Sequence, residues 1–377
     1  MPFDDKLRVL VLFGGRSAEH EISLLSARFI VSSLDPARYE PLLVGVSKRG
    51  RWHLQEEAAL RSGPSDPRAV HVDESLPEVT LAPVPAERAG ERSRALLRVA
   101  GGATQAVDLV FPILHGPLGE DGTLQGLLEL VGLPYVGAGV LGSALGMDKD
   151  AQKRLLAQAE LPVLPFVALR AAAWEAEPEA SLARCEQLGY PLFVKPANMG
   201  SSVGVRRARA RPELAAAIVH ALQFDTKLVV ERGLEMPREI ECSVLGNDEP
   251  EVSVPGEIVV EHPDGFYSYD AKYLDERGAR LEIPAALDAT AQVAVRLLAA
   301  RAFRALECAG MARVDLFLSA DGVLYVNELN TIPGFTAISM YPRLWAASGL
   351  DAVPLVTRLI DLGLERHRRR ARLRTSV

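Results

Sequence analysis

The chain has 377 residues, of which 48% are hydrophobic and 24% are charged, a composition typical of a globular protein with two or three domains. Its formal net charge of −7 argues against a general nucleic-acid binder. Three distant cysteines form no disulfide framework or zinc-binding spacing, and the acidic N-terminus is unlike a signal peptide. We therefore expect a soluble, cytoplasmic protein without a membrane span.

The N-terminal part of the chain begins with a βαβ pattern. A helix is predicted over 22–34 between the first two strand-like runs. Residues 55–106 have weak periodicity and are expected to form a variable surface excursion without a role in the chemistry. The strand-like runs are 7–13, 39–47, 106–114 and 133–140.

The rest of the chain is predicted to contain two further α/β units, and the first domain boundary is placed within 137–147. Helices are expected over 147–160 and 288–310, and between them lie strand-like runs such as YPLFVKPA, TKLVVERGLE and REIECSVLGN. The last 13 residues, ERHRRRARLRTSV, contain six arginines. We expect a solvated and disordered tail there, the alternative being a site for an anionic partner.

Residues 312–330 contain the strongest hairpin signal of the chain. Asp321 and Gly322 lie between two alternating runs, which is typical of a two-residue turn. In that register Ala320 lies opposite Val323.

The same register brings four polar residues to one face, because side chains alternate along a strand. Asp315 is expected opposite Glu328, and Arg313 opposite Asn330. Two directly opposed carboxylates repel each other, and a hard cation such as Mg²⁺ would relieve the repulsion. The alternative is a solvated face on which Arg313 neutralises the pair.

The segment VKPANMGSSVGV lacks the ending of a P-loop, yet it could bind phosphate. Gly200 and Gly204 permit a close approach of the backbone, Ser201 and Ser202 add hydroxyl groups, and Lys195 ends the preceding strand. An ordinary flexible turn is the alternative.

Two residues at strand ends have both a functional and a structural interpretation. Glu19 could hold an ammonium group or merely favour the start of a helix. His115 follows a predicted strand in a glycine-rich loop, where ligands bind in many α/β proteins, but a single histidine is more often structural.

In this order, these pieces resemble the D-alanine–D-alanine ligases of the ATP-grasp superfamily over nearly the whole chain. The matching stretches are LFGGRSAEHEISLLSA, LHGPLGEDGTLQGLLEL, GSALGMDK, VKPANMGSSVGV, REIECSVLGN, DAKY, ARVDLFL and NELNTIPGFTAISMYP. The resemblance implies that ATP phosphorylates the carboxylate of one D-alanine. The amine of a second D-alanine then attacks the acyl phosphate, and the dipeptide serves peptidoglycan synthesis.

The resemblance also implies the roles of individual residues. The ATP-binding residues would be Lys149, Lys195, Ser201, Ser202, Glu231, Leu234, Glu239, Phe266 and Lys272. Two Mg²⁺ or Mn²⁺ ions would be held by Asp315, Glu328 and Asn330. The substrate-binding residues would be Glu19, His115, Arg313, Gly334, Ser339 and Met340.

Within these sets, Arg313 and the backbone N–H of Gly334 would stabilise the oxyanion, and Lys272 would contact the transferred phosphoryl group. Glu19, Ser201 and Tyr273 would form a hydrogen-bonded trio that ties the lid FYSYDAKY over the substrates. The intact Tyr273 favours an amine as the nucleophile.

The fold class that follows is α/β (α+β), an ATP-grasp fold with a Rossmann-like, parallel-sheet N-terminal domain. We expect an N-terminal domain over 1–140, a central ATP-grasp subdomain over 141–235, a C-terminal subdomain over 236–364 and the tail over 365–377. The family leads us to expect a homodimer. Two alternatives are a ligase that uses D-lactate or D-serine as second substrate and a nucleotide-binding regulator without catalysis.

Overall fold

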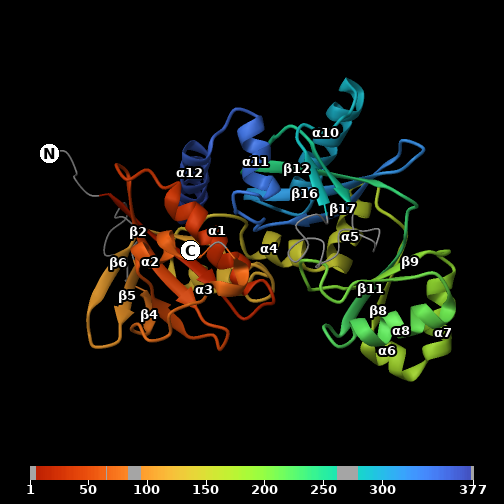
Figure 1. The fold of residues 1–377 in the computed structure, drawn as a ribbon, viewed down its shortest axis with the longest axis horizontal. Helices are drawn as coiled ribbons and strands as arrows, with labels where there is room; N and C mark the ends of the chain where they lie inside the picture. The colour runs from red at the N-terminus through yellow and green to blue at the C-terminus, as the bar shows by residue number, and fades with distance from the viewer. Residues whose placement is uncertain (1–5, 65, 84–94, 261–278, 375–377) are drawn as a thin grey trace.

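The computed structural model describes residues 6–64, 66–83, 95–260 and 279–374. The strands of these residues form four sheets. Figure 1 shows the N-terminal elements (red to orange) at one end, the sheet of β8, β9 and β11 (green) at the other, and the C-terminal strands and helices (cyan to blue) between and above them.

The first sheet is the expected βαβ unit. Strand β1 pairs in parallel with both β2 and β7, and β3 adds an antiparallel edge. Val9 and Val11 face one hydrophobic core, whereas Leu10 and Leu12 face another, so both faces are covered. This explains the uninterrupted apolar run of the sequence. In the order β3-β2-β1-β7, the strands are β1 (Leu7–Gly14), β2 (Tyr39–Val46), β3 (Trp52–Leu54) and β7 (Leu109–Pro112), and helix α1 (His20–Ser32) connects the first two.

The expected surface excursion over 55–106 is wrong for its second half, which forms a three-stranded antiparallel sheet. Val79, Leu97 and Val107 are buried in the core beneath the first sheet. Apolar and polar residues alternate here only over short, irregular stretches, so the periodicity of the sequence did not predict these strands. The elements of this stretch are α2 (Glu57–Ser62), η1 (Pro67–Ala69), β4 (Val79–Pro83), β5 (Ala95–Val99) and β6 (Thr104–Val107).

The strand expected over 133–140 is also wrong. Only an isolated bridge joins Tyr135 to Val110, and Gly137 adopts a φ of 95°, which a regular strand cannot continue through. The flanking helices are α3 (Thr123–Val131), α4 (Val140–Met147) and α5 (Lys149–Gln158).

The second sheet separates an apolar face from a charged one. Leu192 and Val194 of β9 and Val230 of β11 pack on the helices that cover one side. Because side chains alternate, Lys195 and Glu231 lie on the other side. In the order β10-β9-β11-β8, the strands are β8 (Phe166–Arg170), β9 (Leu192–Pro196), β10 (Arg206–Ala208) and β11 (Lys227–Arg232), with helices α6 (Ala171–Ala176), α7 (Pro178–Glu186) and α8 (Arg211–Ala221).

The third sheet has the same division. Ile240, Val314 and Val326 pack beneath α10 (Ala289–Ala305), which leaves the acidic residues of these strands on the opposite face. The strands are antiparallel in the order β15-β14-β12-β16-β17, and β13 also pairs with β12. Their bounds are β12 (Arg238–Gly246), β13 (Glu251–Val252), β14 (Gly256–Val260), β15 (Ala279–Glu282), β16 (Gly310–Leu318) and β17 (Leu324–Asn330).

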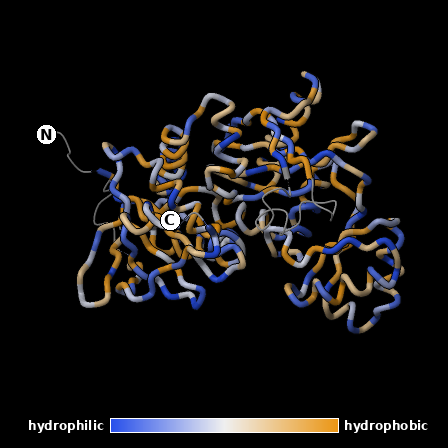
Figure 2. Tube along the Cα trace, in the orientation of Figure 1, coloured by the Kyte–Doolittle hydropathy of each residue, from blue (hydrophilic) through white to orange (hydrophobic). Residues whose placement is uncertain are grey.

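The C-terminal helices return to the N-terminal sheet. Tyr341 of α11 (Met340–Ala347) and Leu359 of α12 (Ala352–Ala371) share one buried core with Val9 of β1. Figure 1 shows both helices beside α1, and Figure 2 shows orange segments inside this region and blue ones at its outer loops. No helix in the described part of the chain is both long and apolar enough to span a bilayer.

The prediction of a disordered tail is wrong for residues 365–371, which continue α12. The guanidinium group of Arg366 donates hydrogen bonds to the carbonyl oxygens of Gly137 and, at 3.2 Å, Tyr135. It also lies 4.2 Å from the centre of the Tyr135 ring. Several of the arginines therefore hold the end of the chain against the protein, and charge alone had suggested solvation.

Candidate active site

The polar face of the β16–β17 hairpin forms the floor of the site. Asp315 lies opposite Glu328, and Arg313 lies opposite Asn330, as the sequence predicted. The turn differs from the prediction, because the pairs next to it, such as Leu318 with Leu324, are offset by one residue. Val323 bonds to Ser319 rather than facing Ala320.

A β-bulge reconciles the two registers. Leu316 pairs with Val326 and Asp315 with Glu328, so Asn327 has no counterpart on β16. Bulges of this kind commonly re-aim a side chain beside an active site. Here the side-chain carbonyl oxygen of Asn327 accepts a hydrogen bond of 3.3 Å from Lys195 Nζ on the second sheet. The bulge thus links the charged faces of the two sheets.

Each of the two opposed carboxylates is paired with a cationic side chain. Arg313 donates from Nε to Asp315 Oδ1 and from Nη2 to Asp315 Oδ2, both at 2.7 Å. Lys149 Nζ lies 3.4 Å from Glu328 Oε2, and Asn330 Nδ2 donates to Asp315 Oδ2 at 3.1 Å. Arg313 therefore neutralises Asp315, as the alternative interpretation expected, but Glu328 pairs with Lys149 and the face is largely buried.

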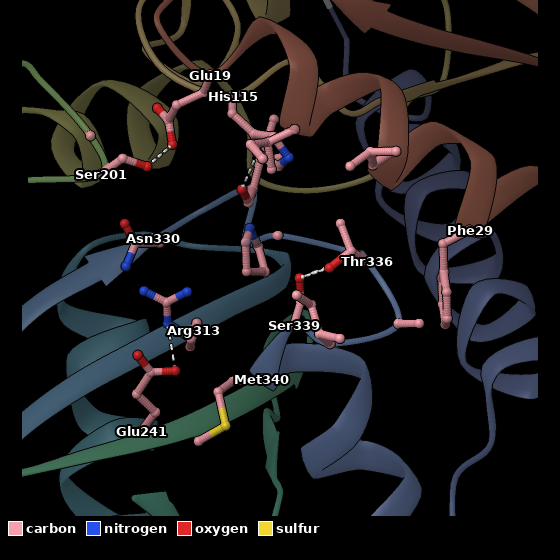
Figure 3. Close-up of a pocket in the computed structure, with 18 of the residues that line it drawn as sticks. Glu19, Phe29, His115, Ser201, Glu241, Arg313, Asn330, Thr336, Ser339 and Met340 are labelled. Carbon is pink, nitrogen blue, oxygen red and sulfur yellow. Dashed lines mark hydrogen bonds and ion pairs between the residues drawn. The ribbon is translucent and has the colours of Figure 1, made fainter. Parts of the chain in front are cut away.

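A second carboxylate reaches Arg313 from the neighbouring strand β12. Glu241 lies beside Asp315 in the β12–β16 ladder, and its Oε2 is 3.1 Å from Arg313 Nε. Burial lowers the pKa of Arg313, but Asp315 and Glu241 outweigh burial and hold that pKa well above its usual range. Figure 3 shows Glu241 and Asn330 on opposite sides of the guanidinium group.

Above this floor lies a cavity of about 630 Å³. It opens between α1, the loop after β7, the glycine-rich loop and the loop before α11 (Figure 3). The predicted residues that line it are Glu19, His115, Ser201, Arg313, Glu328, Asn330, Gly334, Ser339 and Met340. Pro67 lines it too, so the stretch over 55–106 does reach the site.

The glycine-rich loop and α1 meet at the rim of this cavity. Ser201 Oγ donates a hydrogen bond to Glu19 Oε1 (Figure 3). Ser201 has a φ of 49° and Ser202 one of 59°, which turns the loop sharply. A Cβ atom at Gly200 would lie 2.7 Å from Glu19 Oε2, so the close approach requires glycine.

His115 connects the cavity wall to the loop that contains Gly334. Its Nδ1 donates to the carbonyl oxygen of Ile332 at 3.0 Å, and its Nε2 lies 3.1 Å from Ser26 Oγ. That hydroxyl also accepts the N–H of Phe335 at 3.2 Å. Burial lowers the pKa of His115, so the neutral ring fits this network.

The loop before α11 is held by its own hydroxyl groups. Ser339 Oγ accepts the N–H of Thr336 at 3.0 Å and lies 2.7 Å from Thr336 Oγ1. A Cβ atom at Gly334 would lie 3.0 Å from Ser339 Oγ, which shows how tightly the loop folds. Met340 begins α11 and is buried beside the cavity.

The lysines and acids predicted for the nucleotide form a separate charged cluster beneath the second sheet. Glu231 forms ion pairs with two lysines. Its Oε1 pairs with Lys195 Nζ, and its Oε2 lies 2.8 Å from Lys153 Nζ. Burial raises the pKa of Glu231, but Lys153 and Lys195 outweigh burial and lower it to about 2. Glu239 is close enough to help raise the pKa of Lys195.

The remaining predicted residues are near this cluster or outside the described part of the chain. Lys149 Nζ donates to the carbonyl oxygen of Met199 at 2.7 Å, so it lies between the glycine-rich loop and Glu328. Leu234 is half-buried in the segment that joins β11 to β12. Phe266, Lys272 and Tyr273, with the predicted lid, lie outside the described residues.

Sequence reasoning missed three charged residues that the fold brings to these sites. Lys153 lies four residues after Lys149, one turn along the same helix face. Glu241 follows Glu239 by two residues and so shares its strand face. Glu120 belongs to the HGPLGEDG segment and lines the cavity. Their spacing was visible, but the distances that give them partners were not.

The oxygen set of Asp315, Glu328 and Asn330 has the chemistry that Mg²⁺ or Mn²⁺ prefers. Among the described residues, no group of three or more His, Cys, Asp and Glu side chains is arranged to hold a metal. The two carboxylates are directed at Arg313 and Lys149 instead. The residues fit a divalent cation chemically, provided that Arg313 releases Asp315 and Lys149 releases Glu328.

The charged faces of the second and third sheets carry lysines and acidic oxygens, and the solved structures that resemble this chain identify it as an enzyme with the ATP-grasp fold. Residues 8–138 match the family model described as D-ala D-ala ligase N-terminus, and residues 155–361 match D-ala D-ala ligase C-terminus. The chain therefore belongs to the D-alanine–D-alanine ligase family.

Individual relatives agree with this assignment over almost their full lengths. D-alanine–D-alanine ligase A of Chromobacterium violaceum is 50% identical over 365 residues, which cover 96% of both chains. The ligase A of Escherichia coli K12 is 47% identical over 375 residues, or 99% of this chain and 100% of the relative. The solved D-alanine–D-alanine ligase of Coxiella burnetii superimposes with a TM-score of 0.81 at 38% identity, covering 97% of this chain and 96% of that one.

Proposed function

We propose that this enzyme joins two D-alanine molecules into D-alanyl-D-alanine at the expense of ATP, for peptidoglycan precursor synthesis. The observation that carries the proposal is the cavity in which Glu19, Ser201, Arg313, Gly334 and Ser339 converge beside the paired carboxylates of the hairpin. The names of the relatives supply the substrate.

In the first step a carboxylate oxygen of the first D-alanine attacks the γ-phosphorus of ATP, and ADP leaves. Glu19 on α1 would hold the ammonium group of that D-alanine, and Ser201 would fix Glu19 through their hydrogen bond. Lys149 and Lys195 would bind phosphate oxygens as mobile positive charges. Glu231, Leu234 and Glu239 would surround the nucleoside, with Ser202 and Phe266 nearby.

Asp315, Glu328 and Asn330 would hold two Mg²⁺ or Mn²⁺ ions, which would neutralise charge on the transferring phosphoryl group. For that purpose Arg313 must leave Asp315, and Lys149 must leave Glu328. The side chains of Arg313 and Lys149 would then be directed at substrate oxygens.

In the second step the amine of the second D-alanine attacks the acyl carbon, and phosphate leaves from the tetrahedral intermediate. Arg313 and the N–H of Gly334 would stabilise the oxyanion, while Ser339 and Met340 would lie by the acceptor's carboxylate. Lys272 would contact the transferred phosphoryl group, and Tyr273 would tie the lid to Glu19 and Ser201. The lid would exclude water, which otherwise hydrolyses an acyl phosphate.

Purified enzyme with ATP, Mg²⁺ and D-alanine should release phosphate and form D-alanyl-D-alanine, identified by mass spectrometry. Addition of equimolar D-lactate or D-serine should leave the dialanine as the main product at neutral pH. A mixed product in excess would contradict the assignment of the acceptor. A chain that hydrolyses no ATP with D-alanine present would contradict ligase activity altogether.

We also propose a cytoplasmic homodimer. The three cysteines are free and buried, which suits a reducing compartment. Sedimentation equilibrium should give twice the 40.8 kDa mass of the chain, and a single-chain mass would contradict the dimer.

A further inference from the structure

Arg313 and the metal compete for one carboxylate. In the structure Asp315 uses both oxygens to accept Nε and Nη2 of Arg313 at 2.7 Å. A carboxylate that holds an arginine in this two-bonded geometry has one lone pair of each oxygen occupied, and the positive guanidinium group beside it repels a cation. Metal binding at Asp315 is therefore favoured when the guanidinium group moves toward another anion.

Glu241 is the carboxylate placed to receive it. Its Oε2 already lies 3.1 Å from Arg313 Nε, and its side chain is 6% exposed. Glu241 sits in register with Asp315 on the adjacent strand, so Arg313 needs only to shift its hydrogen bonds from one strand to the next. The carboxylate lines the same cavity (Figure 3).

The backbone position of Glu241 is closely packed. Its neighbour on β14 is Gly256, where a Cβ atom would lie 2.5 Å from Met340 Cε. The tip of the Met340 side chain therefore packs against the backbone of β14 next to the strand position of Glu241. The next pair on the same face is Ser243 with Arg313. The hydroxyl group of Ser243 donates to the carbonyl oxygen of Tyr341 at 3.1 Å.

We propose that Glu241 is a positioning residue that takes over Arg313 and thereby frees Asp315 to bind the metal. It contacts no reacting atom; it holds the guanidinium group in place for the oxyanion while Asp315 serves the cation. This inference rests on the proposed function, since it assumes a metal at Asp315.

The test is Mn²⁺ binding in the presence of ADP, measured by electron paramagnetic resonance on full-length protein. In Glu241→Gln, Arg313 loses the carboxylate on β12 and keeps its two hydrogen bonds to Asp315, so Mn²⁺ affinity should fall roughly tenfold or more. The control is Glu257→Gln. Glu257 is a buried carboxylate one strand away that binds Arg238 at 2.8 and 2.6 Å, and its loss should leave Mn²⁺ affinity unchanged.

A double-mutant cycle separates this mechanism from a simple loss of negative charge. With Arg313→Met the guanidinium group no longer competes for Asp315, so adding Glu241→Gln should no longer weaken Mn²⁺ binding. If the penalty persists in that background, Glu241 acts by its charge alone, and the proposal is wrong. Equal affinities of Glu241→Gln and wild type would overturn it as well.

These measurements distinguish a failure of this inference from a failure of the proposed function. Wild-type enzyme that binds Mn²⁺ with the predicted cycle but forms no dipeptide would overturn the proposed reaction and leave the role of Glu241 intact. Wild-type enzyme that binds no Mn²⁺ with ADP would overturn the role of Glu241.

Discussion

Glu120 is a carboxyl group that the fold keeps almost entirely from water. It is 8% exposed, and its Oε1 accepts the N–H of Gly116 at 2.7 Å. Burial and the nearby charge of Glu19 raise its pKa to about 8. At neutral pH the folded protein therefore carries a proton here that the unfolded chain, with a pKa of 4.5, releases.

The raised pKa gives the first prediction. Between pH 4.5 and about 8 the folded state binds more protons than the unfolded state, so this group's contribution to stability is lost as pH rises. Glu120→Gln keeps the hydrogen bond and removes the titration. The Tm of the variant minus the Tm of the wild type should therefore be larger at pH 8.5 than at pH 5. Calorimetry at both pH values measures this difference. A Tm difference that is constant with pH would contradict the raised pKa.

Lys153 is a buried ammonium group whose partner is Glu231. The side chains of both are 2% exposed, and 2.8 Å separates Nζ from Oε2. Breaking such a pair by removing one partner costs about 3–5 kcal/mol, because the other charge stays buried.

Lys153→Met should lower Tm and raise the KM for ATP, since Lys195 must then balance Glu231 alone. The KM for D-alanine should stay near the wild-type value, because Lys153 does not line the substrate cavity. Steady-state kinetics with each substrate varied in turn measure this difference. A parallel rise in both KM values would indicate a general loss of structure instead.

At the scale of elements, the sequence predicted the strands and helices whose apolar period is regular. The β16–β17 pairing of Asp315 with Glu328 followed from alternation and a turn signal. The position of the turn did not, because the register reaches these residues only through the bulge at Asn327. At that bulge Asn327 contacts Lys195 of another sheet, and no local pattern encodes this contact.

The glycine-rich loop is coupled to α1 by one side-chain hydrogen bond, from Ser201 to Glu19. A hydrogen bond to a charged group contributes about 1.5–3 kcal/mol. Ser201→Ala should therefore lower kcat roughly tenfold or more, with the ATP dissociation constant nearly unchanged. Lys195→Ala, on the preceding strand, should weaken ATP binding itself. Calorimetric titration with ATP separates the two, and equal losses of ATP affinity in both variants would contradict a latch.

At the scale of the whole molecule, chain segments far apart in sequence share one core. Val9, Phe335 and Leu359 belong to a single buried cluster that joins the first strand to the last helix. Periodicity shows that each segment is amphipathic but not which partner it meets. For this reason the sequence did not predict that α12 packs on the N-terminal sheet or that its basic end is helical.

The end of α12 should matter for stability rather than for chemistry. Arg366 binds the carbonyl oxygens of Tyr135 and Gly137 and stacks on the Tyr135 ring, although these residues are distant from it in the sequence. Arg366→Ala should lower the free energy of unfolding by about 2 kcal/mol or more, since it leaves buried carbonyl groups without a donor. Arg372→Ala, an exposed position on the same segment, is the matched control and should change little. Urea denaturation measures both, and equal effects would contradict the anchoring role.

The central claim is that ATP activates the carboxylate of one D-alanine for attack by a second. It is tested most directly with D-alanine labelled with ¹⁸O in its carboxylate, followed by mass spectrometry of the released phosphate. Transfer through an acyl phosphate predicts one ¹⁸O atom in each phosphate, formed together with the dipeptide. Phosphate without ¹⁸O would mean that water, not the substrate carboxylate, takes the phosphoryl group, and would contradict the account.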